Sequence, residues 1–227
     1  MRGEIAANLA EIRERADAAA CRAKRDPGEV EVMVVSKTFP AEIVQGAVDA
    51  GQTLFGENKV QEAEGKIPGL DAGLRWHLIG HLQRNKIRKA LPLFEAVHSL
   101  DSLKLARAVD RVAGEMGLRP QVYLQVNLGR EESKHGFQDD ALAAVLDDLL
   151  TLEHVGLVGL MCIPPAGPDV RRWFSALRDL RDDLEVRSGM KLPGLSMGMS
   201  HDYETAIEEG STIVRVGSAV FGARSKR

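Results

Sequence analysis

The stretch Val32-Met33-Val34-Val35-Ser36-Lys37-Thr38 begins as an apolar, β-branched run and ends abruptly in a lysine. Such a run is typical of a buried parallel strand, because both of its faces are covered by other structure. The residue after the run then lies at the carboxyl ends of the strands, where α/β folds keep their chemistry. Lys37 can bind an anion there or, if partly desolvated, serve as an amine nucleophile that forms a Schiff base. Most lysines are solvated surface groups, so the rest of the chain has to distinguish these alternatives.

The composition is that of a globular protein with a sizeable core. The chain has 227 residues, 44% of them hydrophobic, and α/β barrels commonly form one domain at this length. Its 30 basic and 33 acidic residues give a net charge of -3, which argues against a nucleic-acid-binding domain. Cys21 and Cys162 suggest no disulfide framework and fit a reducing compartment. Residues 1–20 lack the apolar region of a signal peptide, and the longest apolar run, 155–163, is too short to span a bilayer. We therefore expect a soluble, cytoplasmic protein that binds neither nucleic acid nor membranes.

Helix and strand patterns alternate along the chain. An amphipathic helix over 3–24 opens it and should pack on the main domain. Short apolar runs predict strands at 31–36, 53–55, 74–79, 94–98, 121–126, 155–161, 195–197 and 213–216. Helical patterns lie between them at 40–50, 58–66, 82–91, 102–116, 139–150, 169–186 and 203–209. Asp101 is the expected N-cap of the helix that starts at residue 102.

Strict alternation of strands and helices implies parallel strands joined by right-handed crossovers. Eight such units predict an α/β fold of the (β/α)8 TIM-barrel type, with the additional N-terminal helix outside it. A doubly wound open sheet is the alternative, but such sheets usually have fewer strands. No linker or shift in composition divides the chain, so we expect a single domain over residues 1–227.

Function in such a barrel lies at the carboxyl ends of the strands. A polar, glycine-rich set of residues follows the predicted strands, which argues for a binding site there. Its members are Lys37, Glu57, Asn58, Gly80, His81, Ser99, Asn127, Met161, Gly198 to Ser200 and Arg215 to Ser218.

Two of these strand ends suit a phosphate group. Ser200 precedes a predicted helix and can either cap it or donate its hydroxyl to an anion. Exposed N–H groups at Gly217 and Ser218 can cradle phosphate oxygens after the last strand. Phosphate sites in barrels typically use the loops after the seventh and eighth strands, and these are those loops. We therefore favour a phosphate site, with a plain helix cap at Ser200 as the alternative.

Lys37 should lie close to these loops, because the first and last strands are neighbours in a closed barrel. An amine nucleophile beside a phosphate site suggests pyridoxal 5'-phosphate (PLP) held as a Schiff base on the lysine. A phosphorylated sugar held through a Schiff base, as in an aldolase, is the other chemical interpretation. That reaction needs an acid or base near the lysine, and the sequence offers no convincing one.

Seven ordered segments resemble the PLP homeostasis protein family, the single-domain relatives of the alanine racemase barrel. They are VVSKT (34–38), FGENKVQE (55–62), WHLIGHLQRNK (76–86), VHSLDSLKLA (97–106), GLMCIPP (159–165), LSMGMSHDYETAI (195–207) and GSTIVRVGSAVFG (210–222). The resemblance covers nearly the whole chain, and the order and spacing of its segments are highly specific. One departure is Lys59, where the family often carries an aromatic residue, and it affects packing near Asn58 rather than the cofactor.

The resemblance implies that Lys37 carries PLP. It also implies that Arg215 contacts the pyridine nitrogen and that the phosphate contacts fall on Ser200, Gly217 and Ser218. An arginine stays protonated and cannot readily give a proton to the ring nitrogen, so the ring is a weaker electron sink. The predicted cofactor contacts are Lys37, Asn58, Ser200, Arg215, Gly217 and Ser218.

The alanine racemase fold carries a second, β-rich domain whose tyrosine is the opposite acid or base, and we expect this chain to lack it. Tyr123 and Tyr203 fall outside the corresponding segment, and we interpret both as packing residues. We therefore predict a non-catalytic protein of PLP homeostasis that hands the cofactor to PLP-accepting apo-enzymes. A PLP-dependent amino-acid racemase is the alternative, and weak activity of that kind stays open. Without the second domain and its interface, we expect a monomer.

Other polar residues have simpler explanations. His81 can serve as a base, but we favour a structural or loop role, and His77 reads as a satisfied core or interface histidine. Cys162, beside the mouth, is predicted to pack rather than to react. The basic run 84–89 is interpreted as a solvated helix face, with a phosphate or partner contact as the alternative.

Overall fold

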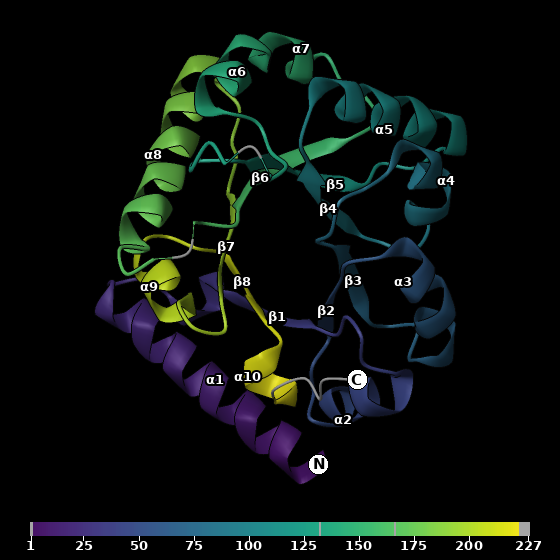
Figure 1. The fold of residues 1–227 in the computed structure, drawn as a ribbon, viewed down its shortest axis with the longest axis vertical. Helices are drawn as coiled ribbons and strands as arrows, with labels where there is room; N and C mark the ends of the chain where they lie inside the picture. Colours follow the sequence, from purple (N-terminus) through teal and green to yellow (C-terminus); the bar gives the residue numbers. More distant parts are fainter. Residues whose placement is uncertain (1, 132, 166, 223–227) are drawn as a thin grey trace.

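A computed structural model of the chain shows a closed barrel of eight parallel strands (Figure 1). The structure describes residues 2–131, 133–165 and 167–222, so the end of the predicted domain after residue 222 lies outside the described part. Each strand pairs with the next, and β8 pairs with β1 to close the barrel. The strands are β1 (Glu31–Val35), β2 (Leu54–Glu57), β3 (Arg75–Leu78), β4 (Ala96–Leu100), β5 (Gln121–Val126), β6 (Gly156–Cys162), β7 (Gly194–Met199) and β8 (Ile213–Val216).

Helices surround the barrel as an outer ring, which confirms the predicted (β/α)8 fold with an additional N-terminal helix (Figure 1). None of the helices in the described ranges is long and apolar enough to cross a membrane. The α-helices are α1 (Arg2–Arg22), α2 (Ala41–Asp49), α3 (Val60–Lys66), α4 (Ile87–Ala90), α5 (Leu103–Met116), α6 (Asp139–Ala144), α7 (Leu146–Leu150), α8 (Arg171–Ser188), α9 (Tyr203–Glu208) and α10 (Ser218–Phe221). Short 3-10 turns are η1 (Pro27–Glu29), η2 (Ile67–Gly69) and η3 (Arg84–Lys86).

The additional helix α1 packs against α2, α9 and α10 (Figure 1). Its apolar residues recur every three or four positions and are buried, as a single helical stripe requires. Arg15 and Arg22, on its polar side, form ion pairs with Glu204 and Glu208 of α9. The stripe and the ion pairs together fix α1 over the part of the barrel that carries β8 and β1.

The strands are largely buried on both faces, as their β-branched sequences predict. One apolar cluster fills the space between the barrel and the helices. A second fills the barrel interior and consists of Met33, Leu54, Ala96, Tyr123, Met161 and Ile213. Met33 pairs with Arg215 across the β1–β8 seam. Paired residues of neighbouring strands point to the same side of a sheet, so Arg215 also points into the barrel.

The segment predicted as a helix over 82–91 is mostly not one. It forms the turn η3 and the four-residue helix α4, because Gln83 has extended backbone angles and Pro92 cannot continue a helix. The exposed side chains of Arg88 and Lys89 form ion pairs with carboxylates on α5 and α3. The basic run therefore lies on a solvated surface, as predicted.

Two further details differ from the sequence-based prediction. The helix predicted over 139–150 is broken at Val145, whose φ of -107° and ψ of 8° leave the helical region and separate α6 from α7. The N-cap of α5 is Ser102, whose hydroxyl accepts the N–H of Leu105 at 3.3 Å, and not Asp101. Asp101 lies one residue too early and instead accepts a hydrogen bond from Ser102.

Candidate functional site

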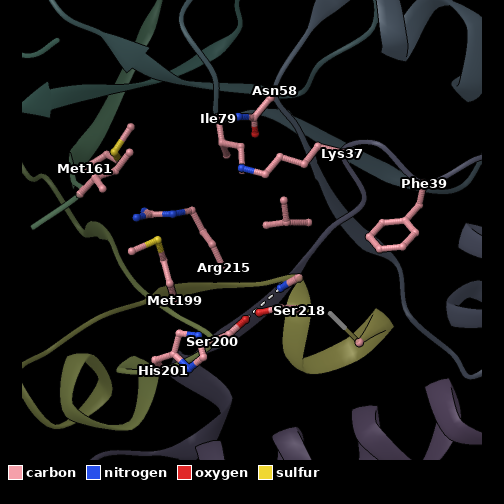
Figure 2. Close-up of a pocket in the computed structure, with 14 residues that line it drawn as sticks. Lys37, Phe39, Asn58, Ile79, Met161, Met199, Ser200, His201, Arg215 and Ser218 are labelled. Carbon is pink, nitrogen blue, oxygen red and sulfur yellow. Dashed lines mark hydrogen bonds between the residues drawn. The ribbon is translucent and has the colours of Figure 1, made fainter. Parts of the chain in front are cut away.

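A cavity of about 260 Å³ opens at the carboxyl ends of the strands, and all six residues predicted to bind the cofactor line it (Figure 2). The structure therefore brings these residues together from four different strand ends. The apolar side chains of the wall are Val35, Phe39, Ile79, Met161, Ile163 and Met199. The polar ones are Lys37, Asn58, Ser200, His201, Arg215 and Ser218.

Lys37 follows the buried end of β1 and points into the cavity (Figure 2). Thr38, the next residue, has a φ of 71°, in the left-handed region that β-branched residues rarely adopt. Its N–H donates to the carboxylate of Glu62, and the N–H of Phe39 donates to the Ser36 carbonyl at 3.1 Å. Such a backbone conformation costs about 1–3 kcal/mol, so it persists only where the surroundings enforce it. The turn that carries Lys37 is therefore held in place from outside.

A buried ion pair that sequence reasoning did not find lies beneath this turn. The carboxylate of Glu57 accepts hydrogen bonds from the Ser36 hydroxyl at 2.7 Å and from the Lys66 amine. Lys66 also donates to the Ser36 carbonyl oxygen at 2.8 Å. Burial raises the pKa of Glu57, while the hydrogen bonds from Lys66 and Ser36 lower it. The pair thus fixes both the side chain and the backbone of the residue before Lys37.

Arg215 reaches into the cavity from β8 and is held by neutral groups. Its guanidinium donates to the Ser196 carbonyl at 2.6 Å, to the Ser196 hydroxyl at 2.7 Å and to the Cys162 carbonyl at 2.8 Å. The side chain is buried, and no carboxylate among the described residues forms an ion pair with it. Burial lowers the pKa of Arg215, but the ordinary value is high enough to keep the group charged. A buried cation with neutral partners favours an electron-rich ligand in the cavity.

The loops after β7 and β8 meet at Ser200. Its hydroxyl oxygen accepts the N–H groups of Gly217 at 3.2 Å and Ala219 at 3.3 Å. Both contacts use the oxygen as acceptor, so the hydroxyl hydrogen stays available for a ligand. The alternative of a plain helix cap at Ser200 does not hold, because the N-cap of α9 is Asp202. The predicted exposure of the Gly217 N–H is wrong, because Ser200 accepts it.

Asn58, after β2, lies beside Lys37 on the cavity wall (Figure 2). A Cβ atom at Gly80 would lie 2.1 Å from the Asn58 carbonyl oxygen, so only a glycine permits this close approach of the two loops. The side-chain oxygen Oδ1 of Asn58 is buried and has no hydrogen-bond partner within the described residues. A buried acceptor is costly without a donor, so this atom suits a ligand that brings an N–H or O–H group.

The tyrosines and Cys162 lie away from the cavity chemistry. Tyr123 stacks on His98 inside the barrel, with ring centroids 4.1 Å apart. Tyr203 is buried, with the guanidinium of Arg15 over its ring. Burial raises the pKa of the Cys162 thiol to about 12, so it remains a protonated packing group. All three residues pack as the sequence predicts.

A lysine just after the first strand lines one cavity with the loops after the last two strands of this (β/α)8 barrel. The sequence matches the family described as alanine racemase, N-terminal domain, over residues 3–225. The chain belongs to this family and, within it, to the pyridoxal phosphate homeostasis proteins. The resemblance seen in its sequence motifs is thus confirmed.

The comparisons cover the whole barrel. The pyridoxal phosphate homeostasis protein of Aquifex aeolicus is 41% identical over 220 residues, which cover 95% of this chain and 96% of that protein. The structure of PipY from Synechococcus elongatus PCC7942 with PLP bound is 40% identical, with a TM-score of 0.85 over 96% of this chain and 100% of PipY. Alanine racemase of Clostridium difficile 630 superposes with a TM-score of 0.76 over 99% of this chain and 58% of the racemase. At 14% identity, that likeness shows the fold alone.

Proposed function

We propose that this chain binds PLP in the cavity at the barrel mouth and serves in intracellular PLP homeostasis. The observation that carries the proposal is that Lys37 and the buried cation of Arg215 face one cavity together with Ser200. The names of the related homeostasis proteins and the PLP-bound structure of PipY support the same cofactor.

The residues on the cavity wall fit the functional groups of PLP. The Lys37 amine suits the aldehyde, and the free hydroxyl hydrogen of Ser200 suits the phosphate together with the N–H of Ser218, while Gly217 lines the same part of the cavity with its N–H donated to Ser200. Arg215 has five N–H donors, of which three are engaged within the chain, so donors remain for the pyridine nitrogen. The unpartnered oxygen of Asn58 suits a donor on the ligand.

In the proposed holo form, the Lys37 amine adds to the aldehyde carbon and water leaves, so that a Schiff base joins lysine and cofactor. When bound, PLP supplies an electrophilic carbon for amines. The amine of an acceptor apo-enzyme can then displace Lys37, which leaves as a free amine. Reversible capture of this kind lets the protein store the cofactor and hand it on.

We further propose that the chain lacks robust catalysis. Racemisation needs a second acid or base besides the lysine, and neither tyrosine lines the described cavity wall. Arg215 leaves the ring nitrogen unprotonated and so makes the ring a weaker electron sink. His201 is the one remaining titratable side chain among the described residues of the wall, and it keeps a PLP-dependent amino-acid racemase as the alternative.

The cofactor proposal is tested by loading the full chain with PLP and recording its visible absorbance. We expect a Schiff-base band. Borohydride reduction should then attach PLP permanently to Lys37, and peptide mass spectrometry should detect the modified lysine. Lys37→Ala should lose both signals, whereas Lys59→Ala, at an exposed neighbouring lysine, should keep them. Label on another lysine, or no band after loading, overturns the assignment.

The non-catalytic proposal is tested by incubating the PLP-loaded chain with D- or L-alanine and with D- or L-serine. We expect no interconversion above that of free PLP. Turnover that persists in the intact chain and disappears in His201→Gln establishes the racemase alternative.

We also propose that the chain works as a monomeric single domain. Within the described ranges, the exposed large hydrophobic residues are Ile163, which lines the cavity, and Val186. So few exposed apolar side chains do not make an interface patch. Light scattering should give the mass of one chain, 24.7 kDa, and a doubled mass contradicts the proposal.

A further inference from the structure

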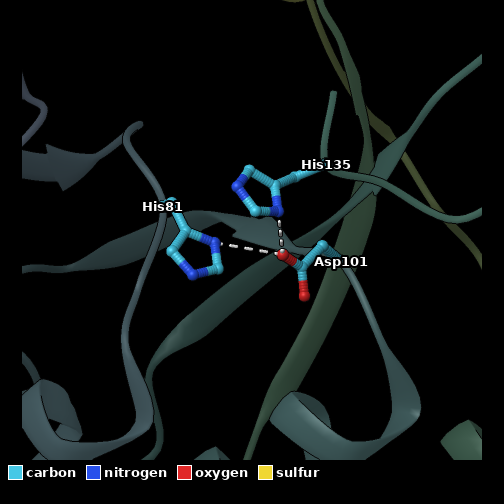
Figure 3. Close-up of side chains that lie close together, drawn as sticks. All are labelled: His81, Asp101 and His135. Atoms are coloured by element: carbon cyan, nitrogen blue, oxygen red, sulfur yellow. Dashed lines mark hydrogen bonds and ion pairs between the residues drawn. The ribbon is translucent and has the colours of Figure 1, made fainter. Parts of the chain in front are cut away.

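A cluster of three metal-ligating side chains lies on the barrel rim outside the proposed PLP cavity (Figure 3). His81 follows β3, Asp101 follows β4, and His135 lies in the loop between β5 and α6. Nδ1 of His81 lies 3.1 Å from Oδ2 of Asp101, and Nδ1 of His135 lies 3.5 Å from the same oxygen. Residues from three successive strand ends thus converge on one point.

We propose that His81, Asp101 and His135 form a binding site for a divalent transition-metal ion, for which Zn²⁺ is the best match. Tetrahedral zinc with bonds of about 2.0–2.1 Å places neighbouring ligand atoms about 3.3 Å apart. The two nitrogen–oxygen separations, 3.1 Å and 3.5 Å, already agree with this spacing. All three ligand atoms lie within 4.8 Å of one another, so a small adjustment of the side chains brings them around one ion.

The two imidazoles can make this adjustment because they lie at the surface. Their rings are stacked, with centroids 4.1 Å apart and planes 14° from parallel, and both Nδ1 atoms face the same carboxylate oxygen. Rotation of each ring about its Cβ–Cγ bond turns both nitrogen lone pairs toward a shared ion. The side chains of His81 and His135 are 41% and 60% exposed, so no core packing opposes this rotation.

The carboxylate, in contrast, is held in place. The side chain of Asp101 is only 11% exposed, and its Oδ1 accepts a hydrogen bond from the Ser102 hydroxyl at 3.1 Å. Ser102 is itself fixed, because it caps α5 by accepting the N–H of Leu105. Oδ2 is left facing the two histidines. Hydrogen bonding of one carboxylate oxygen outside the coordination sphere is how metal sites orient their ligands.

Hydrogen bonds also hold the backbone close to His135. The Asn127 side chain donates to the carbonyl oxygens of Glu131 at 2.9 Å and Lys134 at 3.2 Å. The Gln125 side chain donates to the carbonyl of His135 itself at 3.0 Å. The backbone of the third ligand is therefore positioned before any ion binds, which lowers the entropy cost of closing the site.

Two imidazoles and one carboxylate select the type of ion. Imidazole suits Zn²⁺, Co²⁺, Ni²⁺ and Cu²⁺, whereas Mg²⁺ and Ca²⁺ prefer an all-oxygen set of ligands. Three protein ligands leave the fourth position of a tetrahedral ion to water or to a small ligand, as in open zinc sites. The competing explanation is a metal-free cluster in which the carboxylate accepts hydrogen bonds from both imidazoles.

The test is titration of the untagged, chelator-treated full chain with Zn²⁺, followed by calorimetry. The chain carries Cys21→Ser, because Cys21 is an exposed free thiol that can bind zinc itself. We expect one saturable site per chain, and Co²⁺ in its place should give the intense visible bands of a tetrahedral ion. His81→Ala, His135→Ala and Asp101→Asn should each weaken binding by about tenfold or more.

His154→Ala is the matched control, since this exposed histidine lies in the connection between α7 and β6, outside the cluster. It should leave Zn²⁺ affinity unchanged. The two histidine variants change surface side chains, so they test the site even if Asp101→Asn disturbs folding. The proposal is overturned if Zn²⁺ shows no saturable binding. It is also overturned if the His81→Ala/His135→Ala double variant binds Zn²⁺ as tightly as the unchanged chain, and in either case the cluster is only hydrogen-bonded. The result is independent of PLP binding.

Discussion

Nδ1 of His98 lies 2.8 Å from the hydroxyl of Ser196, the residue that orients Arg215. Arg215 donates to this hydroxyl, so the serine hydrogen needs another acceptor, and His98 Nδ1 is within reach. His98 then carries its own hydrogen on Nε2 and donates it to Nδ1 of His77, 3.0 Å away. The hydrogen of His77 therefore sits on Nε2, which faces the Glu95 carboxylate at 3.7 Å. Every donor in this series of hydrogen bonds, from Arg215 through Ser196 to the histidines, points away from the cavity. The groups that fix the guanidinium are therefore neutral and buried.

Ser196→Ala should break this series at its centre. The substitution leaves an Arg215 N–H and the His98 nitrogen without partners in the barrel interior, at a cost of about 1–3 kcal/mol in the free energy of unfolding. We also expect PLP affinity to fall, because the guanidinium loses its orientation. Urea unfolding and PLP titration measure the two effects.

Ser99→Ala is the matched control for that experiment. Ser99 is also a buried strand serine, but its hydroxyl has no hydrogen-bond partner in the described structure. Its removal should change stability by less than about 0.5 kcal/mol or increase it. Equal losses in the two variants would show that the hydrogen bonds of Ser196 contribute nothing.

The buried histidines should make stability depend on pH. Burial lowers the pKa of His77 to about 4 from its ordinary 6.5, and it holds the pKa of His98 well below the usual value. At a pH between the lowered pKa of each histidine and its ordinary pKa of 6.5, the unfolded chain binds more protons than the folded one. The stability that the neutral histidines contribute is therefore fully present above pH 6.5. It is lost as the pH falls through this range, by about 1.4 kcal/mol per pH unit for each histidine.

Urea unfolding across the same pH window measures that loss. His77→Gln keeps an acceptor for the His98 N–H but cannot be protonated, so its stability should fall less steeply with decreasing pH. A slope as steep as that of the unchanged chain would assign the acid sensitivity to other groups.

Much of the barrel follows from local pattern. The β-branched run before Lys37 and its counterparts recur with helical segments between them, and strict alternation leaves few topologies. The exact position of β4 does not follow in this way. Its prediction at 94–98 places His98 at a strand end, whereas the strand runs to Leu100 and His98 lies inside the barrel. The partner of His98, Ser196, is 98 positions away in sequence, and periodicity carries no information on contacts across a barrel.

The six predicted cavity residues could be found because each one lies within two residues of the carboxyl end of a strand, and the fold collects these ends. Lys66 could not, because a lysine in a short amphipathic helix is usually solvated. Its burial depends on Glu57, which a different element supplies. The acceptor role of Ser200 was missed for a similar reason, since it depends on how closely the loops after β7 and β8 approach.

Gly80→Ala should disturb the cavity through Asn58. The new Cβ would lie 2.1 Å from the Asn58 carbonyl oxygen and 2.7 Å from its Cα, so the two loops must separate. Overpacking of this kind costs about 1–3 kcal/mol, and the displaced Asn58 should weaken PLP binding. Gly65→Ala in α3 is the control, because nothing lies within 4 Å of its new Cβ. It should stabilise the helix by up to about 1 kcal/mol. Unchanged stability and PLP affinity in Gly80→Ala would contradict the close approach of the two loops.

Lys66→Met should be the most destabilising of these substitutions. It leaves the buried carboxylate of Glu57 without its cation, at a cost of about 3–5 kcal/mol. Lys66→Met/Glu57→Gln should recover part of this loss, since the amide oxygen can still accept the Ser36 hydroxyl. Lys89→Met, which breaks the exposed pair with Glu64, should cost less than about 1 kcal/mol.

The pH dependence of the Lys66→Met variant identifies the cause of its instability. Without Lys66, the Ser36 hydrogen bond opposes the effect of burial with less help, so the pKa of Glu57 lies further above the unfolded value. The folded variant then binds a proton more readily than the unfolded one, so its stability relative to the unchanged chain should rise as pH falls. The double variant has no carboxylate at this position and should show no such recovery. Because Lys66 also holds the Ser36 carbonyl, both variants should load PLP onto Lys37 more slowly, even at a pH where Glu57 is neutral. A loading rate that recovers together with stability would mean that the buried pair supports the fold but does not position Lys37.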